Sequence, residues 1–332
     1  MNERIKGLFR ALAKRGRGLK TAPPLGFIIL ILTNRCNLKC KTCLRGESTA
    51  QDLDPGLLDG LFTKAKRIGF NAVAFTGGEP IIHPKFGEIL RIAGTHGLKL
   101  GLVTNGVRWT DYLKVLAPYA GQVNFIAVSL DSHIREINDS IRGPGTYDKA
   151  IEAVRSFKKA GYSVRISHVV NKKNYRDLAD FVGFANRTVK PDAINLLGII
   201  KTGENTDLLL NAEEKTVFHK ELGKLLPRYR NLRVCISTGY YKAPFYCPSF
   251  LGLNELTVNC NGELVFCCDN TRTGATLGSL KERPLEELLR EYFIRQMEIK
   301  DRAIKDVVNS ENKSTHDCNY CNEILKSLTP GK

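Results

Sequence analysis

The stretch Phe27-Ile-Ile-Leu-Ile-Leu-Thr33 leads directly into Asn34-Arg-Cys36-Asn-Leu-Lys-Cys40-Lys-Thr-Cys43. Its first part is a short, strongly apolar run, which predicts a β-strand. Its second part places three thiols within eight residues, so one short loop can direct all of them at a single inorganic centre. The stretch therefore predicts a strand whose carboxyl end carries a metal-binding loop.

Two kinds of metal centre are compatible with this loop. Iron–sulfur clusters are held by Cys thiolates at close spacings of this kind. A cubane cluster takes four ligands and the loop offers three, which leaves one iron open to bind another molecule. The alternative is a zinc site with a fourth ligand from elsewhere, because tetrahedral zinc sites also use short cysteine spacings. The cluster is the favoured interpretation.

Strands and amphipathic helices alternate along residues 27–200. The predicted strands are Phe27–Thr33, Ala72–Thr76, Lys99–Thr104, Asn124–Leu130, Ser163–Val170 and Ala193–Ile200. The predicted helices include Pro55–Ile68, Phe86–His96, Tyr147–Ala160, Tyr175–Phe184 and, further along, Ala212–Leu226. Six strand–helix units indicate an α/β fold with a parallel sheet, helices outside it and right-handed crossovers.

Polar motifs stand at the ends of the first four predicted strands. The cysteine loop follows the first strand, Thr76-Gly-Gly-Glu79 the second and Thr104-Asn-Gly106 the third, and Ser129-Leu-Asp131 ends the fourth. In a parallel barrel the chemistry lies at the carboxyl ends of the strands. These motifs are therefore expected to meet in one site.

The cysteine loop, followed about forty residues later by Gly77-Gly78-Glu79-Pro80, resembles the radical S-adenosylmethionine (SAM) enzymes. The resemblance implies a partial (β/α)6 parallel barrel. It also implies that Cys36, Cys40 and Cys43 hold a [4Fe–4S] cluster whose fourth iron binds SAM. In that family an electron from the cluster cleaves SAM to methionine and a 5′-deoxyadenosyl radical, which abstracts a hydrogen atom from the substrate. The protein positions and shields this chemistry.

The resemblance assigns contacts with SAM to residues after the second and third strands. Gly77, Gly78 and Glu79 correspond to the segment that binds the SAM amino group, although alone they could form an ordinary strand-to-helix turn. Asn105 also fits the family pattern, and its alternative is a turn residue in an Asn-Gly pair.

Further contacts are implied around the fourth strand. Ser129 and Arg142 match the family pattern Ser-Leu-Asp followed by Arg-Gly, in which serine and arginine typically meet the ribose or carboxylate of SAM. An arginine fork suits a carboxylate, and the alternative for Arg142 is a surface charge beside a helix. His168 is expected at a strand end, where it either reaches the cavity or is a satisfied core histidine.

Residues 235–332 carry seven of the ten cysteines, and we expect a small cysteine-rich α+β domain there. The spacing of these cysteines resembles the auxiliary-cluster extensions of the radical SAM family, called SPASM in the long form and twitch in the short form. The resemblance implies one auxiliary [4Fe–4S] cluster, held by Cys247, Cys267, Cys318 and Cys321. A structural zinc site on the same four thiolates is the alternative.

The remaining C-terminal cysteines are interpreted without a metal. Gly262, in Cys260-Asn-Gly-Glu, predicts a hairpin turn that presents Cys267 on the returning strand. Cys268 would then point to the opposite face of that strand and is left out of the ligand set. Cys235 and Cys260 are interpreted as small buried apolar residues.

The chain of 332 residues has a formal charge of +16, partly concentrated in residues 1–20. That basic amphipathic segment can contact an anionic membrane surface or an acidic partner, but a helix packed on the barrel wall is favoured. No aromatic-studded basic patch indicates a nucleic-acid partner. Without a membrane span or signal peptide, we expect a cytoplasmic protein. In that compartment, clustered cysteines indicate metal or redox chemistry.

The expected organisation is a basic N-terminal segment at 1–24, a radical SAM barrel with a linking helix at 25–234 and an auxiliary-cluster domain at 235–332. We expect a radical SAM oxidoreductase with an auxiliary cluster for electron transfer, acting on a small molecule or a peptide. A ferredoxin or flavodoxin is the expected electron donor. Peptide maturation is an alternative function, although only about 26 residues precede the first strand, too few for a fused leader-recognition domain. A non-enzymatic zinc-binding or electron-carrier scaffold is the third alternative.

Overall fold

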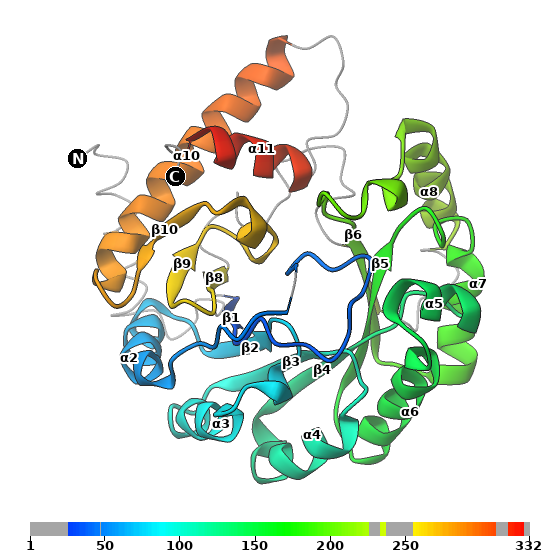
Figure 1. The fold of residues 1–332 in the computed structure, drawn as a ribbon, viewed down its shortest axis with the longest axis horizontal. Helices are drawn as coiled ribbons and strands as arrows, with labels where there is room; N and C mark the ends of the chain where they lie inside the picture. Colours follow the sequence, from blue (N-terminus) through cyan, green and yellow to red (C-terminus); the bar gives the residue numbers. More distant parts are fainter. Residues whose placement is uncertain (1–25, 47, 226–232, 237–254, 310–317, 329–332) are drawn as a thin grey trace.

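The computed structural model describes residues 26–46, 48–225, 233–236, 255–309 and 318–328 (Figure 1). The predicted N-terminal segment 1–24 and Cys247 lie outside these ranges. No helix among the described residues is long and apolar enough to cross a membrane.

The described strands form one sheet in the order β10-β9-β8-β1-β2-β3-β4-β5-β6-β7. Neighbouring strands run parallel from β8 through β1 to β7, whereas the β8–β9 and β9–β10 pairs are antiparallel. The strands are β1 (Phe27–Ile31), β2 (Ala72–Thr76), β3 (Lys99–Thr104), β4 (Val123–Ser129), β5 (Val164–Val170), β6 (Ala193–Gly198), β7 (Arg233–Ile236), β8 (Glu255–Val258), β9 (Glu263–Val265) and β10 (Thr276–Ser279).

Helices cover the convex side of this curved sheet (Figure 1). They are α2 (Leu58–Ile68), α3 (Phe86–Thr95), α4 (Trp109–Leu116), α5 (Arg135–Arg142), α6 (Thr146–Lys159), α7 (Leu178–Phe184), α8 (Ala212–Leu225) and α10 (Leu285–Asn309). The last helix, α11 (Cys318–Leu328), packs against α10 and the turn η8 instead. Short helical turns are η1 (Pro55–Leu57), η2 (Pro80–Ile82), η3 (Ala117–Gln122), η4 (Ala185–Val189), η5 (Thr206–Leu208) and η8 (Cys268–Thr273). Alternating strands and outer helices confirm the predicted α/β fold, an open, partial barrel.

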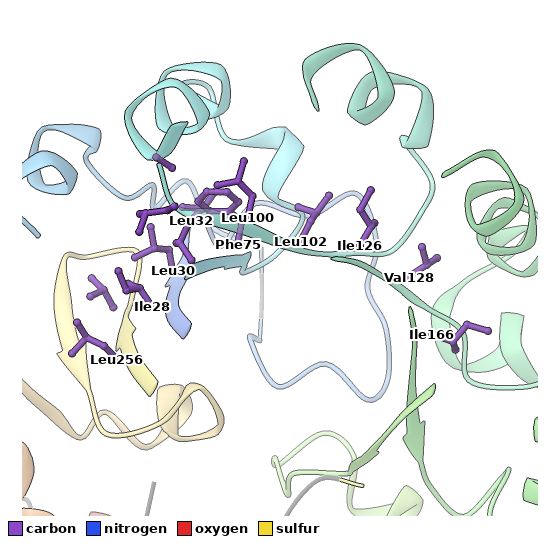
Figure 2. Packing of buried hydrophobic residues seen from close by; sticks show 14 of the residues in the cluster. Ile28, Leu30, Leu32, Phe75, Leu100, Leu102, Ile126, Val128, Ile166 and Leu256 are labelled. Carbon is purple, nitrogen blue, oxygen red and sulfur yellow. The ribbon is translucent and has the colours of Figure 1, made fainter. Parts of the chain in front are cut away.

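The main core lies between the sheet and the outer helices. Figure 2 shows Phe75, Leu102, Ile126 and Val128 along the face of the sheet that the helices cover, and all four are almost fully buried. Branched and aromatic side chains fill this interface because they pack well on a pleated surface. The core fixes each strand, and thereby fixes the position at which each carboxyl-end loop begins.

The C-terminal extension shares this sheet. β8 pairs in parallel with β1, from Phe27 opposite Glu255 to Leu30 opposite Val258. Leu256, on β8, belongs to the same hydrophobic core as the barrel strands. β7 begins before the predicted domain boundary between residues 234 and 235 and ends after it. It pairs in parallel with β6, so it belongs to the barrel sheet. The division of the chain at that position stays a prediction.

Candidate functional site

The loop after β1 is fixed at its base by Asp52. The Thr33 hydroxyl donates a hydrogen bond of 2.6 Å to Asp52 Oδ1. Arg35 Nε donates to both carboxylate oxygens of Asp52, at 3.1 and 3.0 Å. These charge-assisted bonds hold the chain immediately before Cys36, so the loop leaves the strand in a defined direction.

The Gly77-Gly78 segment lies directly against this loop. Gly78 N donates to Thr33 O at 2.6 Å, and Glu79 N donates to Arg35 O at 2.8 Å. A Cβ added at Gly77 would lie 2.6 Å from Thr33 O, and one at Gly78 would lie 2.1 Å from Arg35 O. Gly77 also has a φ of +138°, which favours glycine. Both glycines are therefore required for the contact between the two loops.

The three loop thiols surround one cavity of about 470 Å³. Its lining residues are Asn34, Cys36, Leu38, Lys39, Cys40, Lys41, Cys43, Arg45, Gly46, Ser48, Gly78 and Glu204. Backbone amides reach two of the sulfurs, because Leu38 N donates to Cys36 Sγ and Arg45 N donates to Cys43 Sγ, both at 3.4 Å. Three thiols with amide donors around a space of ligand size fit an iron–sulfur cluster with one open iron.

Burial disfavours the thiolate form of two of these thiols. It raises the pKa of Cys36 above its ordinary value. It also raises the pKa of Cys40 to about 11, although the nearby Arg142 acts in the opposite direction. Because metals bind the thiolate, loading this site must release protons.

Arg142 lies close to the cysteine loop but forms a buried ion pair. Its Nε lies 2.8 Å from Asp131 Oδ2, and both side chains are buried. The end of α5 also contacts the loop, because Lys41 N donates to Ile141 O at 2.8 Å and Cys40 Sγ donates to Arg142 O at 3.6 Å. The surface-charge alternative for Arg142 is wrong. The role of Asp131 as its partner was missed, although Asp131 ends the Ser-Leu-Asp motif.

Glu79 is fully buried and its carboxylate is occupied by protein donors. Oε1 accepts from the Thr104 hydroxyl at 2.7 Å and from the Tyr112 hydroxyl, and Oε2 accepts from Asn105 N at 2.9 Å. Burial raises the pKa of Glu79 despite these bonds. Glu79 is not among the residues that line the cavity. The structure places it behind the site, where it joins β2 to the end of β3.

Asn105 connects this buried network to the cysteine loop. Its Nδ2 donates to Asn37 Oδ1 at 2.9 Å, and its Oδ1 accepts from Val107 N at 2.9 Å. The second bond is the turn interaction of an Asn-Gly pair. Asn105 is therefore a turn residue and also lies beside the cysteine loop. Asn37, between Cys36 and Cys40, was not singled out from the sequence.

The two other candidates lie on neighbouring strands. Ser129 is half-buried at the carboxyl end of β4, opposite Ser167 of β5, and does not line the described cavity. His168 is buried with its ring 4.0 Å from the Phe181 ring, and its Nδ1 donates to Leu130 O at 3.2 Å. His168 is therefore buried in the core, but it is not the satisfied core histidine of the second alternative, because its buried Nε2 has no hydrogen-bond partner among the described residues.

The predicted hairpin around Gly262 is confirmed, but the position of Cys267 differs. β8 and β9 are antiparallel, and Gly262 has a φ of +81°. β9 ends at Val265, so Cys267 lies beyond the strand, where it caps η8 by accepting from Asp269 N. The sulfurs of Cys267 and Cys268 and a Glu255 carboxylate oxygen all lie within 4.8 Å of one another. The opposite-face argument for Cys268 is therefore wrong, because strand alternation stops before these residues.

The other C-terminal cysteines are only partly described. Cys321 packs against the core from α11, and the next residue, Asn322, donates from Nδ2 to Asp269 O in η8 at 3.3 Å. This brings the helix of Cys321 against the turn that follows Cys267. Cys260 is buried, as predicted. Cys247 and the side chains of Cys235 and Cys318 lie outside the described residues. The described thiols fit either a cluster or a zinc ion.

Two family models match the chain. The radical SAM superfamily matches residues 30–185, which include the cysteine loop. The iron–sulfur cluster-binding domain called SPASM matches residues 247–322, which include the four predicted C-terminal ligands. Members of these families hold a SAM-binding [4Fe–4S] cluster and auxiliary clusters, respectively.

Individual relatives agree with these matches. The mycofactocin maturase of Mycobacterium tuberculosis is 34% identical over 162 residues, 47% of this chain and 40% of the relative. The chain thus spans less than half the length of that relative. The AdoMet-dependent heme synthase of Oleidesulfovibrio alaskensis is 26% identical over 269 residues, 74% of this chain and 67% of the relative.

A solved structure shares the fold. Streptococcus suis SuiB bound to S-adenosylmethionine superposes with a TM-score of 0.67 at 17% identity, over 87% of this chain and 70% of SuiB. SuiB has also been solved bound to its precursor peptide SuiA. Motifs, sheet topology and both family matches lead to one assignment: residues 30–185 belong to the radical SAM superfamily, and residues 247–322 belong to the SPASM-type iron–sulfur cluster-binding domains.

Proposed function

We propose that this chain is a radical SAM enzyme that abstracts a hydrogen atom from a substrate. The observation that carries the proposal is the arrangement of Cys36, Cys40 and Cys43 around one cavity that Gly78 also lines. When bound there, a [4Fe–4S] cluster supplies the electron that cleaves SAM to methionine and a 5′-deoxyadenosyl radical.

The chain's own residues hold and enclose this centre. The three thiolates bind iron, and the amides of Leu38 and Arg45 donate to two of the sulfurs. Gly77 and Gly78 bring the β2 loop against the cysteine loop and leave room for the SAM amino group beside it. Glu79 and Asn105 support that loop from behind. We therefore propose that they contribute to SAM binding by holding the loop in position.

Ser129 and Arg142 remain the proposed contacts of the SAM ribose or carboxylate. Arg142 is paired with Asp131, and its backbone carbonyl accepts from Cys40. In our proposal the ion pair holds the end of α5 beside the loop.

The proposed auxiliary [4Fe–4S] cluster is held by Cys247, Cys267, Cys318 and Cys321. Four thiolates leave no iron open, so its role is electron transfer, with a ferredoxin or flavodoxin as the external donor to the enzyme. Cys268 lies close enough to Cys267 to compete with it. Iron analysis of Cys267→Ser and Cys268→Ser proteins separates the two thiols. Cytoplasmic location and contact of residues 1–20 with a membrane stay predictions.

We propose a peptide as the first substrate class. Support comes from the shared fold with SuiB, which has been solved with a precursor peptide. A small molecule is the second candidate, since the heme synthase aligns over 74% of this chain. Anaerobic incubation with peptides and with small metabolites, scored for 5′-deoxyadenosine above the uncoupled background, distinguishes the two.

The decisive variant changes Cys36, Cys40 and Cys43 together to Ala. We expect a folded protein with about half the iron of the parent, because four C-terminal thiolates remain. SAM cleavage with a strong chemical reductant should be abolished. Unchanged SAM cleavage, or zinc in place of iron and sulfide in anaerobically purified parent protein, would contradict the proposed function and favour the scaffold alternative.

A further inference from the structure

Arg45 lies at the edge of the first cysteine set. It follows Cys43 by two residues, is half-buried and lines the cavity. Its backbone N donates to Cys43 Sγ at 3.4 Å. The backbone of Arg45 is therefore fixed by the same loop that carries the three thiols.

The guanidinium of Arg45 reaches the C-terminal cysteine loop. Its Nη1 donates to the backbone carbonyl of Cys268 at 2.9 Å and to the Thr271 hydroxyl at 2.7 Å. Both acceptors belong to η8, the turn that directly follows Cys267. Cys268 Sγ in turn lies within 4.8 Å of Cys267 Sγ. One side chain thus spans from the amide beside Cys43 to the turn beside Cys267.

We propose that Arg45 is a positioning residue that holds the C-terminal cysteine loop against the loop of Cys36, Cys40 and Cys43 and places a fixed positive charge between them. The inference rests on the proposed function, because both loops are taken to hold iron–sulfur centres. Neither family match assigns a role to this arginine.

Arginine suits this role better than lysine. Its planar fork can direct one nitrogen at two oxygens from a fixed geometry, whereas a lysine ammonium is a flexible, strongly hydrated point charge. A nearby positive charge also favours the more negative, reduced state of a metal centre. Removing the fork should free η8, and removing the charge should lower the reduction potential of the adjacent centres.

Three variants separate the fork from the charge. Arg45→Met removes both, Arg45→Lys keeps the charge, and Thr271→Val removes one acceptor while leaving Arg45 intact. The matched control is Arg283→Met. Arg283 likewise bonds a backbone carbonyl, that of Leu277, and a side chain, that of Glu287, but entirely within its own short segment.

The first measurement is amide hydrogen exchange of residues 266–274 in the iron-loaded protein. We expect exchange on the order of tenfold faster in Arg45→Met, the size that loss of a charge-assisted bond supports. Arg45→Lys and Thr271→Val should show smaller increases, and Arg283→Met none in this segment. Unchanged exchange in both Arg45→Met and Thr271→Val would overturn the proposal.

The second measurement is the reduction potential of each centre, followed by electron paramagnetic resonance during redox titration. Arg45→Met should lower the reduction potential of a centre, and Arg45→Lys, which keeps the charge, should retain the parental potential. A merely structural role of Arg45 would not produce this difference. If Arg45→Met fails to retain iron, the hydrogen exchange rate of Thr271→Val tests the proposal instead, because this variant leaves the Cys43 loop unaltered. A parent protein without iron or SAM cleavage would instead contradict the proposed function, whereas loaded variants identical to the parent contradict the role of Arg45.

Discussion

The carboxylate of Glu79 lies inside the protein, between the ends of β2 and β3. It accepts from Thr104, Tyr112 and the Asn105 amide, and no part of it is exposed. Glu79→Gln keeps the shape but turns one acceptor into a donor that faces hydroxyl donors. We expect the free energy of unfolding to fall by about 1–3 kcal/mol, measured by urea denaturation.

The same variant tests where Glu79 acts. Tyr112→Phe removes one donor to the carboxylate without approaching the cavity, and it should reproduce part of the loss of stability. In Glu79→Gln the affinity for SAM should fall only indirectly, because Asn105 and the cysteine loop are displaced. A variant of parental stability with strongly weakened SAM binding would instead place the carboxylate in direct contact with SAM.

His168 is the residue with the clearest pH signature. Burial lowers its pKa to about 4. The unfolded chain therefore takes up a proton as the pH falls through about 6.5, while the folded protein does not until about pH 4. Stability contributed by neutral His168 is present above pH 6.5 and is lost below it, by about 2 kcal/mol between pH 6.5 and pH 5.

Urea denaturation of His168→Leu at several pH values checks this expectation. The variant should be less stable than the parent at pH 7.5, because Leu130 O loses its donor. Its stability should fall less steeply between pH 6.5 and pH 5. Equal slopes in His168→Leu and the parent would contradict the assignment.

At the scale of elements, the contact between the β1 and β2 loops decides the site. A Cβ at Gly78 would lie 2.1 Å from Arg35 O. The clashing atom belongs to the backbone, which cannot move aside as the end of a flexible side chain can. Gly78→Ala should therefore displace the cysteine loop. We expect loss of the iron bound there and of SAM cleavage, while circular dichroism still reports the α/β fold.

Gly60 in α2 is the matched control for this change. A Cβ at Gly60 meets nothing within 4 Å, and alanine is the better helix former by about 1 kcal/mol. Gly60→Ala should keep its iron and be equal to or more stable than the parent. If Gly78→Ala retains full iron content, the clash between the loops is not what fixes the cluster site.

The sequence predicted the elements whose pattern is local. β2 and β3 were predicted with their observed bounds, because each is a buried apolar run between turn residues. α4 and α5 were missed, since eight residues hold too few apolar positions to show a helical period. The parallel pairing of β8 with β1 was not predictable either, because it joins segments far apart in the chain.

The candidate site divides in the same way. The cysteine loop and the glycines were found from spacing, which is a local property. The partners of Glu79 and Arg142 were not, because burial and pairing depend on how strands and helices pack. Cys268 was misplaced because the alternation rule was extended three residues beyond the end of β9.

At the scale of the whole molecule, the C-terminal extension completes the sheet. β8 covers the edge of β1, and an uncovered strand edge with apolar side chains promotes aggregation. Leu256, Leu264, Leu288 and Tyr292 are nearly fully buried and belong to the same core as the barrel. A chain that ends at residue 236 should therefore be aggregated or much less stable than the parent.

A longer truncation separates folding from metal binding. A chain that ends at residue 309 keeps β8 to β10 and α10 but lacks α11, which carries Cys318 and Cys321. This chain loses the buried side chains of Ile324 and Leu325. Loss of one such side chain from a core lowers the free energy of unfolding by about 2–5 kcal/mol. The edge of β1 nevertheless stays covered by β8. Size-exclusion chromatography should show a soluble chain at 309 and aggregates at 236, and iron analysis should show only the first centre at 309. If the chain ending at 236 were soluble and cleaved SAM, the barrel would fold alone and the extension would be an independent domain after all.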